Sequence, residues 1–474
     1  MKRLIAGTLA LGVALAAAAP AHAWEPETNA GLTERAARAS KLHAILAQAH
    51  GRALGLYDAL AVAPADAPKL ALKLGKLDPT QGGVPDGRGR QAAISWLITG
   101  ALLEELPGDR SVNHFLDPVH KTGLTRRTVG TVRGLKARAV ALLAGAGLPA
   151  HGRRADEWLV APDNDLGLAR FWTELEAATL AGPSAQRERH LAYALVCAGA
   201  IVSVLEDLAS PSRVRDDLLA HLMPLGGGPD DLGSRTERLA ALAYGRLGVP
   251  APQVAPDRAT WRDFFTAADG QGLADVVHAR AFSQGTLPPE IPLAAPLAAK
   301  RAALAGVVPT LGVKDLAAAT PSDNGTPILD ARGVCLVHAR DNAGTVEWLL
   351  PDECVVDQVG ALLPLAGGYA AGLLDWLFRG TLAVSPTGTV VRGLDLGAGT
   401  LVLLVDDAKG VRRQLGPKLD VAAGKKDTSL TQAPAVPAGT VRLIALFRGK
   451  DARGDELVAV GQAPTPAPAP ATVR

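Results

Sequence analysis

Residues 199–221 read GAIVSVLEDLASPSRVRDDLLAH and carry more information about the fold than any other stretch of the chain. They continue an apolar run with helical periodicity, which predicts a helix over residues 187–209. Because side chains four positions apart share one face of a helix, Ser203 and Asp207 are expected to point the same way. A proline follows the helix, and Asp207 can then cap the helix end or pair with Arg213.

The first 23 residues have the pattern of a cleaved secretory signal. Lys2 and Arg3 precede a short apolar run, and Ala21-His22-Ala23 supplies the small-residue cleavage motif. The run is too short for a transmembrane helix. We therefore expect a secreted or periplasmic protein whose mature chain begins at Trp24.

The charge balance gives no reason to expect a polyanionic partner. The chain has 49 Lys and Arg against 47 Asp and Glu, and the predicted signal removes two cations and no acids. A formally neutral mature chain offers no electrostatic attraction to nucleic acid or anionic membranes. Aromatic residues make up only 4% of the chain, too few for a base-stacking platform. High Ala, Leu and Gly content favours a helical body.

Helical periodicity recurs through the chain and predicts a mainly α fold. The expected helices cover residues 31–61, 91–106, 129–147, 165–182, 187–209 and 235–248. Between them, the Gly-, Pro- and Asp-rich stretches 66–90 and 107–128 are predicted to be long loops, which are often functional. The expected domains are a signal (1–23), a helical body (24–385), a small β-sandwich-like module of short β-branched runs (386–462) and a disordered Pro/Ala tail (463–474).

Three cysteines allow at most one intramolecular disulfide. Cys335 and Cys354 flank two strand-like runs that predict a β-hairpin near residues 333–351. A disulfide between them is compatible with an oxidising compartment, although the spacing alone does not establish it. Cys197 lies in an apolar run and is expected to be a buried free thiol.

Residues 361–380 form the most hydrophobic stretch after the signal. Gly368-x-x-x-Gly372 fits the packing motif of membrane helices. Pro364 interrupts the stretch, however, and Asp375 and Arg379 place two charges on one face. A buried or capping helix of the soluble body is favoured, with membrane contact as the minor alternative.

Further blocks of sequence complete a recognisable pattern. Thr28-Asn29 follows Trp24, residues 96–118 read WLITGALLEELPGDRSVNHFLDP, and residues 272–288 read GLADVVHARAFSQGTLP. With residues 199–221, these blocks resemble the secreted bacterial zinc-dependent phospholipases C and S1/P1-type nucleases. The resemblance covers residues 24–290. It implies a helical phospholipase C/P1 nuclease-like body and, by descent, metal-dependent hydrolysis of phospholipid or nucleic-acid phosphodiesters.

The resemblance also implies a set of metal ligands. The expected ligands are Trp24, Glu105, His114, Asp207 and a relocated His221, with Asp217 and Glu237 as additional candidates. Asp207 and Glu105 are the expected catalytic residues, since carboxylates between metal ions balance charge at an activated water. In the family the amine and carbonyl of the N-terminal Trp bind a metal, which requires the signal to be removed.

Several ligand positions of the family pattern are substituted. Asn29, Ser203 and Arg213 stand where the family has His, and Glu105 replaces an Asp with a longer arm. Asn and Ser are poor zinc ligands beside imidazole, and Arg cannot bind a metal because it stays protonated. We therefore expect fewer zinc ions than in the family, or none.

The sequence leaves open two ways in which the missing metal ligands could be replaced. In the first, Arg213 supplies the missing positive charge and forms an internal ionic cluster with Glu105 and Asp207. In the second, one relocated zinc ion binds to His114, Asp207 and His221. His114 also has an ordinary interpretation as a hydrogen-bonded loop histidine.

Two functions follow. The chain is either a phosphodiester hydrolase with an eroded zinc site or a non-catalytic relative that serves as an envelope or extracellular binding or structural protein. Because three imidazole ligands of the family pattern are absent, the mechanism favours the non-catalytic alternative. The resemblance to the family favours a hydrolase as the ancestral function.

Overall fold

The computed structural model describes most of the chain. The described residues are 24–75, 77, 85–86, 88–105, 110–125, 152–217, 220, 223–224, 232–233, 235–305, 325–380, 382–385, 390–393, 396–422, 428–429 and 436–463. The predicted signal, the helix expected at 129–147, the Pro/Ala tail and His221 therefore lie outside them.

The prediction of a mainly α protein is wrong. The chain is 43% helical and 20% strand, which makes it a mixed α/β protein. The described strands form antiparallel sheets of two to five strands, and several of these lie outside the predicted β module. Strands of two or three residues, such as β1 (Ala59–Ala61) and β2 (Arg90–Ala92), are too short to show alternation in sequence, and their partners are distant along the chain.

Two compact units make up the chain, each built from three segments. The first unit contains Met1–Ala36, Ala101–Asn164 and Val202–Gly372, and the second contains Ala37–Gly100, Asp165–Ile201 and Leu373–Arg474. The helices α5 (Ala93–Glu104), α9 (Ser184–Glu206) and α14 (Asp352–Leu377) contribute residues to both units.

Short helices and turns make up much of the first unit. Its helices are α2 (Pro26–Ala39, up to residue 36), α7 (Ala155–Trp158), α10 (Arg235–Ala243), α11 (Arg262–Phe265), α12 (Leu273–His278) and α13 (Leu297–Ala305). The 3-10 turns η4 (Ser111–Asn113), η6 (Asp207–Ala209) and η8 (Gln284–Thr286) and the strand pair β3 (Met223–Pro224) and β4 (Leu232–Gly233) join them.

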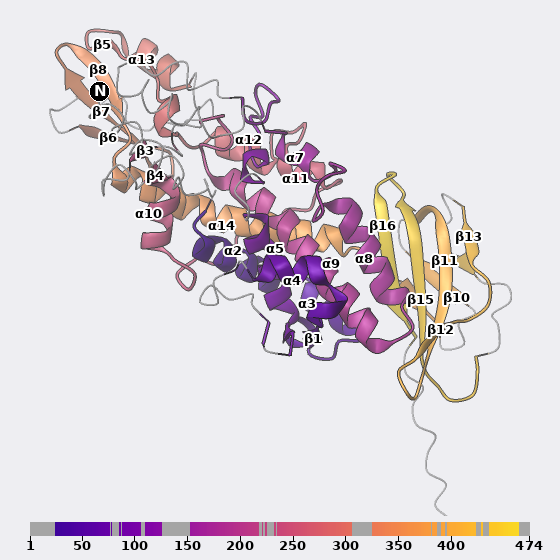
Figure 1. The fold of residues 1–474 in the computed structure, drawn as a ribbon. Coiled ribbons are helices and arrows are strands. Elements are labelled where there is room, and N and C mark those ends of the chain that lie inside the picture. The colour runs from indigo at the N-terminus through magenta and orange to yellow at the C-terminus, as the bar shows by residue number, and fades with distance from the viewer. Residues whose placement is uncertain are drawn as a thin grey trace, which may run out of the picture. The chain divides into compact units, whose positions relative to one another are not determined.

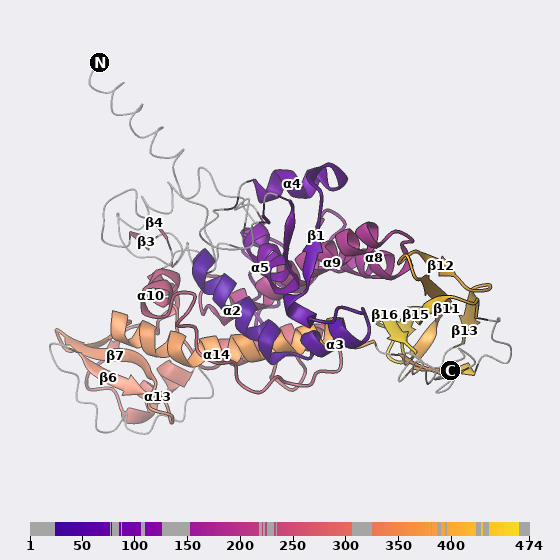
Figure 2. The same cartoon turned by 90° about the horizontal axis from the view of Figure 1, so that it is seen from below.

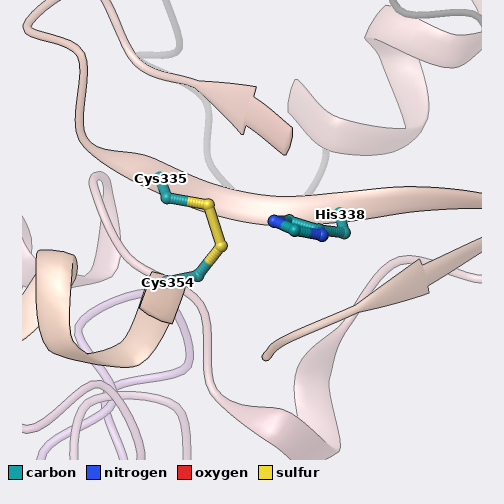
Figure 3. Close-up of side chains that lie close together, drawn as sticks. All are labelled: Cys335, His338 and Cys354. Carbon is teal, nitrogen blue, oxygen red and sulfur yellow. A yellow bond between two sulfur atoms is a disulfide. The ribbon is translucent and has the colours of Figure 1, made fainter. Parts of the chain in front are cut away.

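A four-stranded antiparallel sheet completes the first unit. Its order is β5 (Ile291–Pro292), β8 (Thr345–Leu349), β7 (Cys335–Asn342) and β6 (Thr326–Leu329). Ala343 and Gly344 both have positive φ in the tight turn between β7 and β8, which suits the twist of a hairpin. A disulfide joins Cys335 on β7 to Cys354 on α14, with His338 nearby on the same strand (Figure 3). Figure 2 shows this part of α14 beside β6 and β7.

The second unit combines helices with the predicted β module, which is present. Its helices include α3 (Leu42–Gln48), α4 (Pro68–Leu74) and α8 (Leu168–Leu180). One sheet pairs β12 (Arg412–Gln414), β11 (Leu396–Asp407), β15 (Thr440–Asp451) and β16 (Glu456–Gln462) in that order, with β13 (Leu419–Val421) also on β11. The second sheet contains β14 (Thr428–Ser429), β10 (Val390–Gly393) and β9 (Leu382–Val384).

Side chains of both sheets share one apolar core. Leu382 and Val384 from β9 pack in one cluster with Leu401 and Phe447 from the larger sheet. Helix α8 contacts β15 and β16, and Figure 1 shows it alongside these strands. The burial of one face of each sheet gives the module its stability.

Helices α9 and α14 are long and apolar enough to cross a membrane by length and composition. The apolar window of α9 is entirely buried within the protein and that of α14 is 72% buried, as is typical of core helices. Cys197 on α9 is a buried free thiol, as predicted. At Gly100, helix α5 approaches α9 so closely that a Cβ would lie 1.9 Å from the Val196 carbonyl oxygen, and only glycine fits there.

Candidate functional site

Six polar residues are buried together in the first unit, and we call them the acidic cluster. They are Glu104, Glu105, His114, Ser203, Glu206 and Asp207, each at most 1% exposed. Glu104 and Glu105 come from the end of α5, His114 follows η4, and the other three come from the end of α9 and from η6. Because α9 is apolar around its circumference and is buried, the polar residues at its end are carried into the interior with it.

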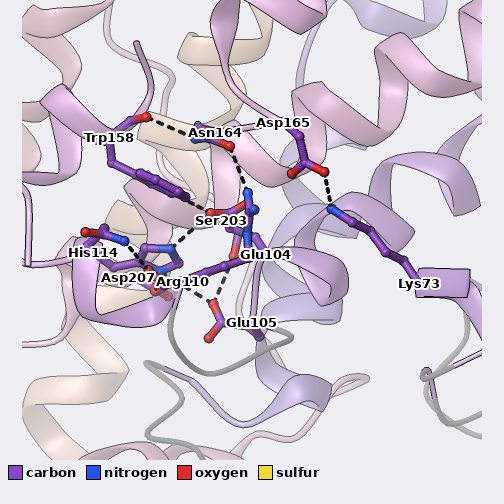
Figure 4. A network of polar contacts seen from close by, with 11 residues as sticks. Lys73, Glu104, Glu105, Arg110, His114, Trp158, Asn164, Asp165, Ser203 and Asp207 are labelled. Atoms are coloured by element: carbon purple, nitrogen blue, oxygen red, sulfur yellow. Dashed lines mark hydrogen bonds and ion pairs between the residues drawn. The ribbon is translucent and has the colours of Figure 1, made fainter. Parts of the chain in front are cut away.

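His114 lies between carboxylates on both sides of its ring (Figure 4). Its Nδ1 lies 2.5 Å from Asp207 Oδ2, and its Nε2 lies 3.3 Å from Glu104 Oε1. Glu105 Oε1 is 3.8 Å from the same Nδ1. Burial alone would lower the pKa of His114, but the bonds to Asp207 and Glu104 outweigh it and raise the pKa to about 9. The ring is therefore an imidazolium that donates to two carboxylates.

Arg110 is a second cation that pairs with the carboxylate of Glu104. Arg110 donates to Glu104 Oε2 at 2.6 Å and to Asn164 Oδ1 at 2.8 Å. The Trp158 indole donates to Glu104 Oε1 at 2.7 Å, and the Arg110 guanidinium lies 5.1 Å from that ring's centroid. Burial opposes ionisation of Glu104, yet Arg110 and His114 lower its pKa overall. Glu104 is therefore a charged carboxylate.

The carboxyl groups of Asp207 and Glu206 both have raised pKa values. Burial, and then the charge of Glu105, raise the pKa of Asp207 to about 7, against the opposing effects of His114 and Arg213. Burial also raises the pKa of Glu206 well above its usual range, although Thr33 donates to its Oε2 at 2.9 Å. Burial therefore disfavours the ionised form of Glu206.

Arg213 lies beside the acidic cluster and against an aromatic ring. Its guanidinium lies 4.5 Å from the centroid of the Phe115 ring and donates to the Ser111 carbonyl at 2.5 Å. The residue is 1% exposed and acts on Asp207 through its charge. Arg213 thus contributes a buried positive charge beside the acidic cluster.

Three residues of the acidic cluster could hold one metal ion. Glu105, His114 and Asp207 offer ligand atoms that all lie within 4.8 Å of one another. Among the described residues, Asp207 Oδ1 and both polar side-chain atoms of Asn29 are buried without a hydrogen-bond partner. Ser203 and Arg213 add no strong metal ligand, because a hydroxyl group binds metals weakly and an arginine stays protonated.

The other sequence-predicted residues are distributed around the cluster. Trp24 is buried, and its indole donates to the Glu206 carbonyl at 3.0 Å, while Ser203 donates to Glu105 Oε1 at 3.3 Å. Asp217 accepts hydrogen bonds from the amides of Ala220 and Gly285 and is not among the clustered ligands of the described residues. Glu237 is buried on α10, and the site proposed for His221 lies outside the described residues.

Three residues of the site were missed by the sequence reasoning. Glu104 precedes the predicted ligand Glu105, Arg110 lies between Glu105 and His114, and Glu206 precedes Asp207. Paired acids at the ends of two apolar helices were the available signal, because two carboxylates carried into a core require nearby cations.

A second group with metal-binding potential contains Cys335, His338 and Cys354. The disulfide between the two cysteines uses both sulfur atoms, so this group has no thiolate to offer a metal.

Comparison with known proteins leaves the family open. No family model and no curated protein matches the chain. Among solved structures, the alpha toxin from Clostridium absonum is similar at 10% sequence identity over 80% of each chain, with a TM-score of 0.25. A likeness at this level carries no argument about fold or activity.

Proposed function

We infer that the chain is an exported phospholipase C/P1 nuclease-like protein in which a buried ionic cluster stands in place of the family's metal centre. Its function is then binding or structural rather than hydrolytic. The observation that carries the proposal is His114, fully buried and held between Asp207 and Glu104 as an imidazolium. Descent from the hydrolases rests on the sequence resemblance over residues 24–290.

The charges near the cluster support this proposal. His114, Arg110 and Arg213 bring positive charge to the carboxyl groups of Glu104, Glu105 and Asp207. A buried carboxylate needs such compensation, because an isolated charge in the interior is strongly unfavourable. These side chains therefore supply the positive charge that metal ions supply in the family pattern.

The burial of the cluster supports the same proposal. A catalytic zinc site keeps an open coordination position for water and substrate. Glu105, His114 and Asp207 are each at most 1% exposed. Such a closed arrangement suits a structural role better than the turnover of a phosphodiester.

One specific observation favours a second candidate, a hydrolase that uses a single divalent cation. Asp207 Oδ1 is buried without a hydrogen-bond partner among the described residues, and a bound cation would satisfy such an oxygen. Glu105, His114 and Asp207 would hold the ion, which would polarise a water or phosphate oxygen when bound.

Metal analysis of the purified mature chain separates the two candidates. We expect no stoichiometric zinc after incubation with zinc and dialysis, and no cleavage of a phosphorylcholine ester or single-stranded DNA. One zinc per chain that is lost in Asp207→Asn, together with zinc-dependent cleavage, would overturn the proposal in favour of the hydrolase.

A gain-of-ligand variant tests the resemblance separately. Restoring histidine at the three substituted positions with Asn29→His, Ser203→His and Arg213→His should create zinc binding if the frame of the family is retained. Failure of a folded triple variant to bind zinc would count against the alignment itself.

Export from the cytoplasm is part of the proposal. The signal-like residues 1–23 and the disulfide between Cys335 and Cys354 both support an oxidising compartment. N-terminal sequencing of the protein from extracellular and periplasmic fractions should give Trp24 as the first residue. An uncut chain found only in the cytoplasm would contradict export.

A further inference from the structure

The second unit contains a cavity of about 210 Å³ lined by four arginines. We call it the arginine pocket and define it by Arg52, Arg187, Arg412, Arg442, His50 and Ser184, all of which line it. None of its lining residues carries a carboxylate. The pocket is smaller than typical sites for drug-sized ligands, which span roughly 300–1,000 Å³.

Two of the four guanidinium groups are already neutralised. Arg412 forms a bidentate pair with Asp406, through bonds of 2.7 Å and 2.8 Å. Arg52 pairs with Glu188 at 3.2 Å. Neither Asp406 nor Glu188 lines the pocket, although each forms an ion pair with an arginine that does.

The other two guanidinium groups form no ion pair with a carboxylate among the described residues. Arg187 is 8% exposed, and among the described residues its side chain donates only to backbone carbonyls, those of Ala181, Gly182 and Gly410. Arg442 is exposed and has no hydrogen bond or ion pair within the described part of the chain. Arg187 and Arg442 therefore line a cavity to which no lining residue contributes a carboxylate, and the buried guanidinium of Arg187 is the one that favours an anionic partner.

Two further features add to the positive potential. Ser184 begins helix α9, whose N-terminal amides carry the positive end of the helix dipole. Burial, and then the charges of Arg52 and Arg412, lower the pKa of His50 to about 4. The two arginines thus add to the effect of burial, which is the larger cause of the lowered pKa.

We propose that the arginine pocket binds a small phosphate-type oxyanion, either free phosphate or the phosphate of a small monoester. Guanidinium groups suit this ligand because their planar N–H forks match pairs of phosphate oxygens. The volume admits a phosphate with a small substituent, and Thr179 and Ser184 line the same space. The inference is independent of the acidic cluster, which belongs to the other unit.

A purely structural role accounts for only part of this arrangement. Arg187 and Arg412 fasten the segment at 179–182 to the β11–β12 hairpin through backbone carbonyls. That fastening needs neither Arg442 nor the cavity. Arg442 is therefore the residue that separates ligand binding from scaffold support.

Calorimetric titration of the full mature chain with inorganic phosphate tests the proposal. Arg442→Gln should weaken phosphate binding by about tenfold or more, as expected for the loss of a charged hydrogen-bonding group. Arg413→Gln is the matched control, because Arg413 neighbours Arg412 but is 74% exposed and does not line the pocket. It should bind phosphate as the unsubstituted chain does, and Arg442→Lys should lie between the two.

A second titrant distinguishes the sources of the phosphate. Tighter binding of glycerol 3-phosphate than of inorganic phosphate would identify a monoester ligand, and the reverse order would identify free phosphate. Absence of binding of either titrant by the unsubstituted chain would overturn the proposal. Equal phosphate affinity of the folded Arg442→Gln and Arg413→Gln variants would overturn it as well.

Discussion

The acidic cluster and the arginine pocket differ in how their positive charges are paired. In the acidic cluster, His114 and Arg110 pair with carboxylates, and the members are sealed from solvent. In the arginine pocket, Arg187 and Arg442 line a cavity to which no lining residue contributes a carboxylate. Burial and charge therefore do not mark a binding site by themselves. Guanidinium groups that line such a cavity do, because an anion that enters it can pair with them.

The largest expected effect comes from removing the central cation of the acidic cluster. His114→Ala leaves Asp207 and Glu104 without a shared partner and should destabilise the chain by roughly 3–5 kcal/mol. Urea unfolding measures the change. His120→Ala is the matched control, since His120 forms a similar 2.7 Å contact to Asp117 but its side chain is 54% exposed, and it should cost less than about 1 kcal/mol. Equal losses in the two variants would show that the cluster is not held by paired charge.

Arg213 should contribute less than His114. Arg213→Met removes a buried charge and its bond to the Ser111 carbonyl, and it should lower the free energy of unfolding by about 2 kcal/mol. Arg262→Met provides the comparison, because Arg262 also lies over an aromatic ring, that of Trp261 at 4.2 Å, but is exposed. A loss no larger than that of Arg262→Met would argue against Arg213 as a replacement for metal charge.

Phosphate should stabilise the second unit by mass action. At ten times its Kd, a ligand that binds only the folded chain adds about 1.4 kcal/mol to the free energy of unfolding. Thermal unfolding at constant ionic strength, with chloride replacing phosphate in the reference, measures this gain. The gain should disappear in Arg442→Gln at the same phosphate concentration, and its persistence there would place the binding elsewhere.

The smallest expected effect is a loss of folding stability as the pH falls below neutrality. Because the folded-state pKa of His50 is lowered to about 4, the unfolded chain binds the extra proton between that value and about 6.5. Stability should therefore fall as the pH falls, with His50 accounting for roughly 0.5–1 kcal/mol between pH 7.5 and pH 6. His50→Gln should remove this part of the slope, and phosphate should reduce it by favouring the protonated ring. An unchanged slope in the variant would contradict the lowered pKa.

Long, strongly patterned elements could be predicted from the sequence, and short non-local ones could not. The apolar run at 187–209 corresponds to α9 (Ser184–Glu206). The helix expected over 31–61 is instead divided into α2 (Pro26–Ala39), α3 (Leu42–Gln48) and the 3-10 turn Gly55–Tyr57, and Gly51 adopts positive φ between the last two. Strand β1 then forms by pairing with residues 90–92, and a contact that distant leaves no local periodicity.

The acidic cluster shows the same division between local and non-local information. Glu105, His114 and Asp207 lie together, which the order of the sequence blocks made it possible to expect. The partners of Glu104 could not be predicted, because the Arg110 and Trp158 contacts depend on how loops return to the end of α5. Arg213 also shows that a residue type at a known position does not fix its contact, since the guanidinium rests on Phe115.

The buried thiol of Cys197 can be used to measure local opening of the protein. The other two cysteines are joined in a disulfide, so this thiol on α9 is the single site for thiol-specific reagents, and burial raises its pKa and suppresses the reactive thiolate. Its labelling rate therefore measures how often the helix core opens to solvent. Since the same helix begins at the arginine pocket, the labelling rate can register ligand binding there without any added probe.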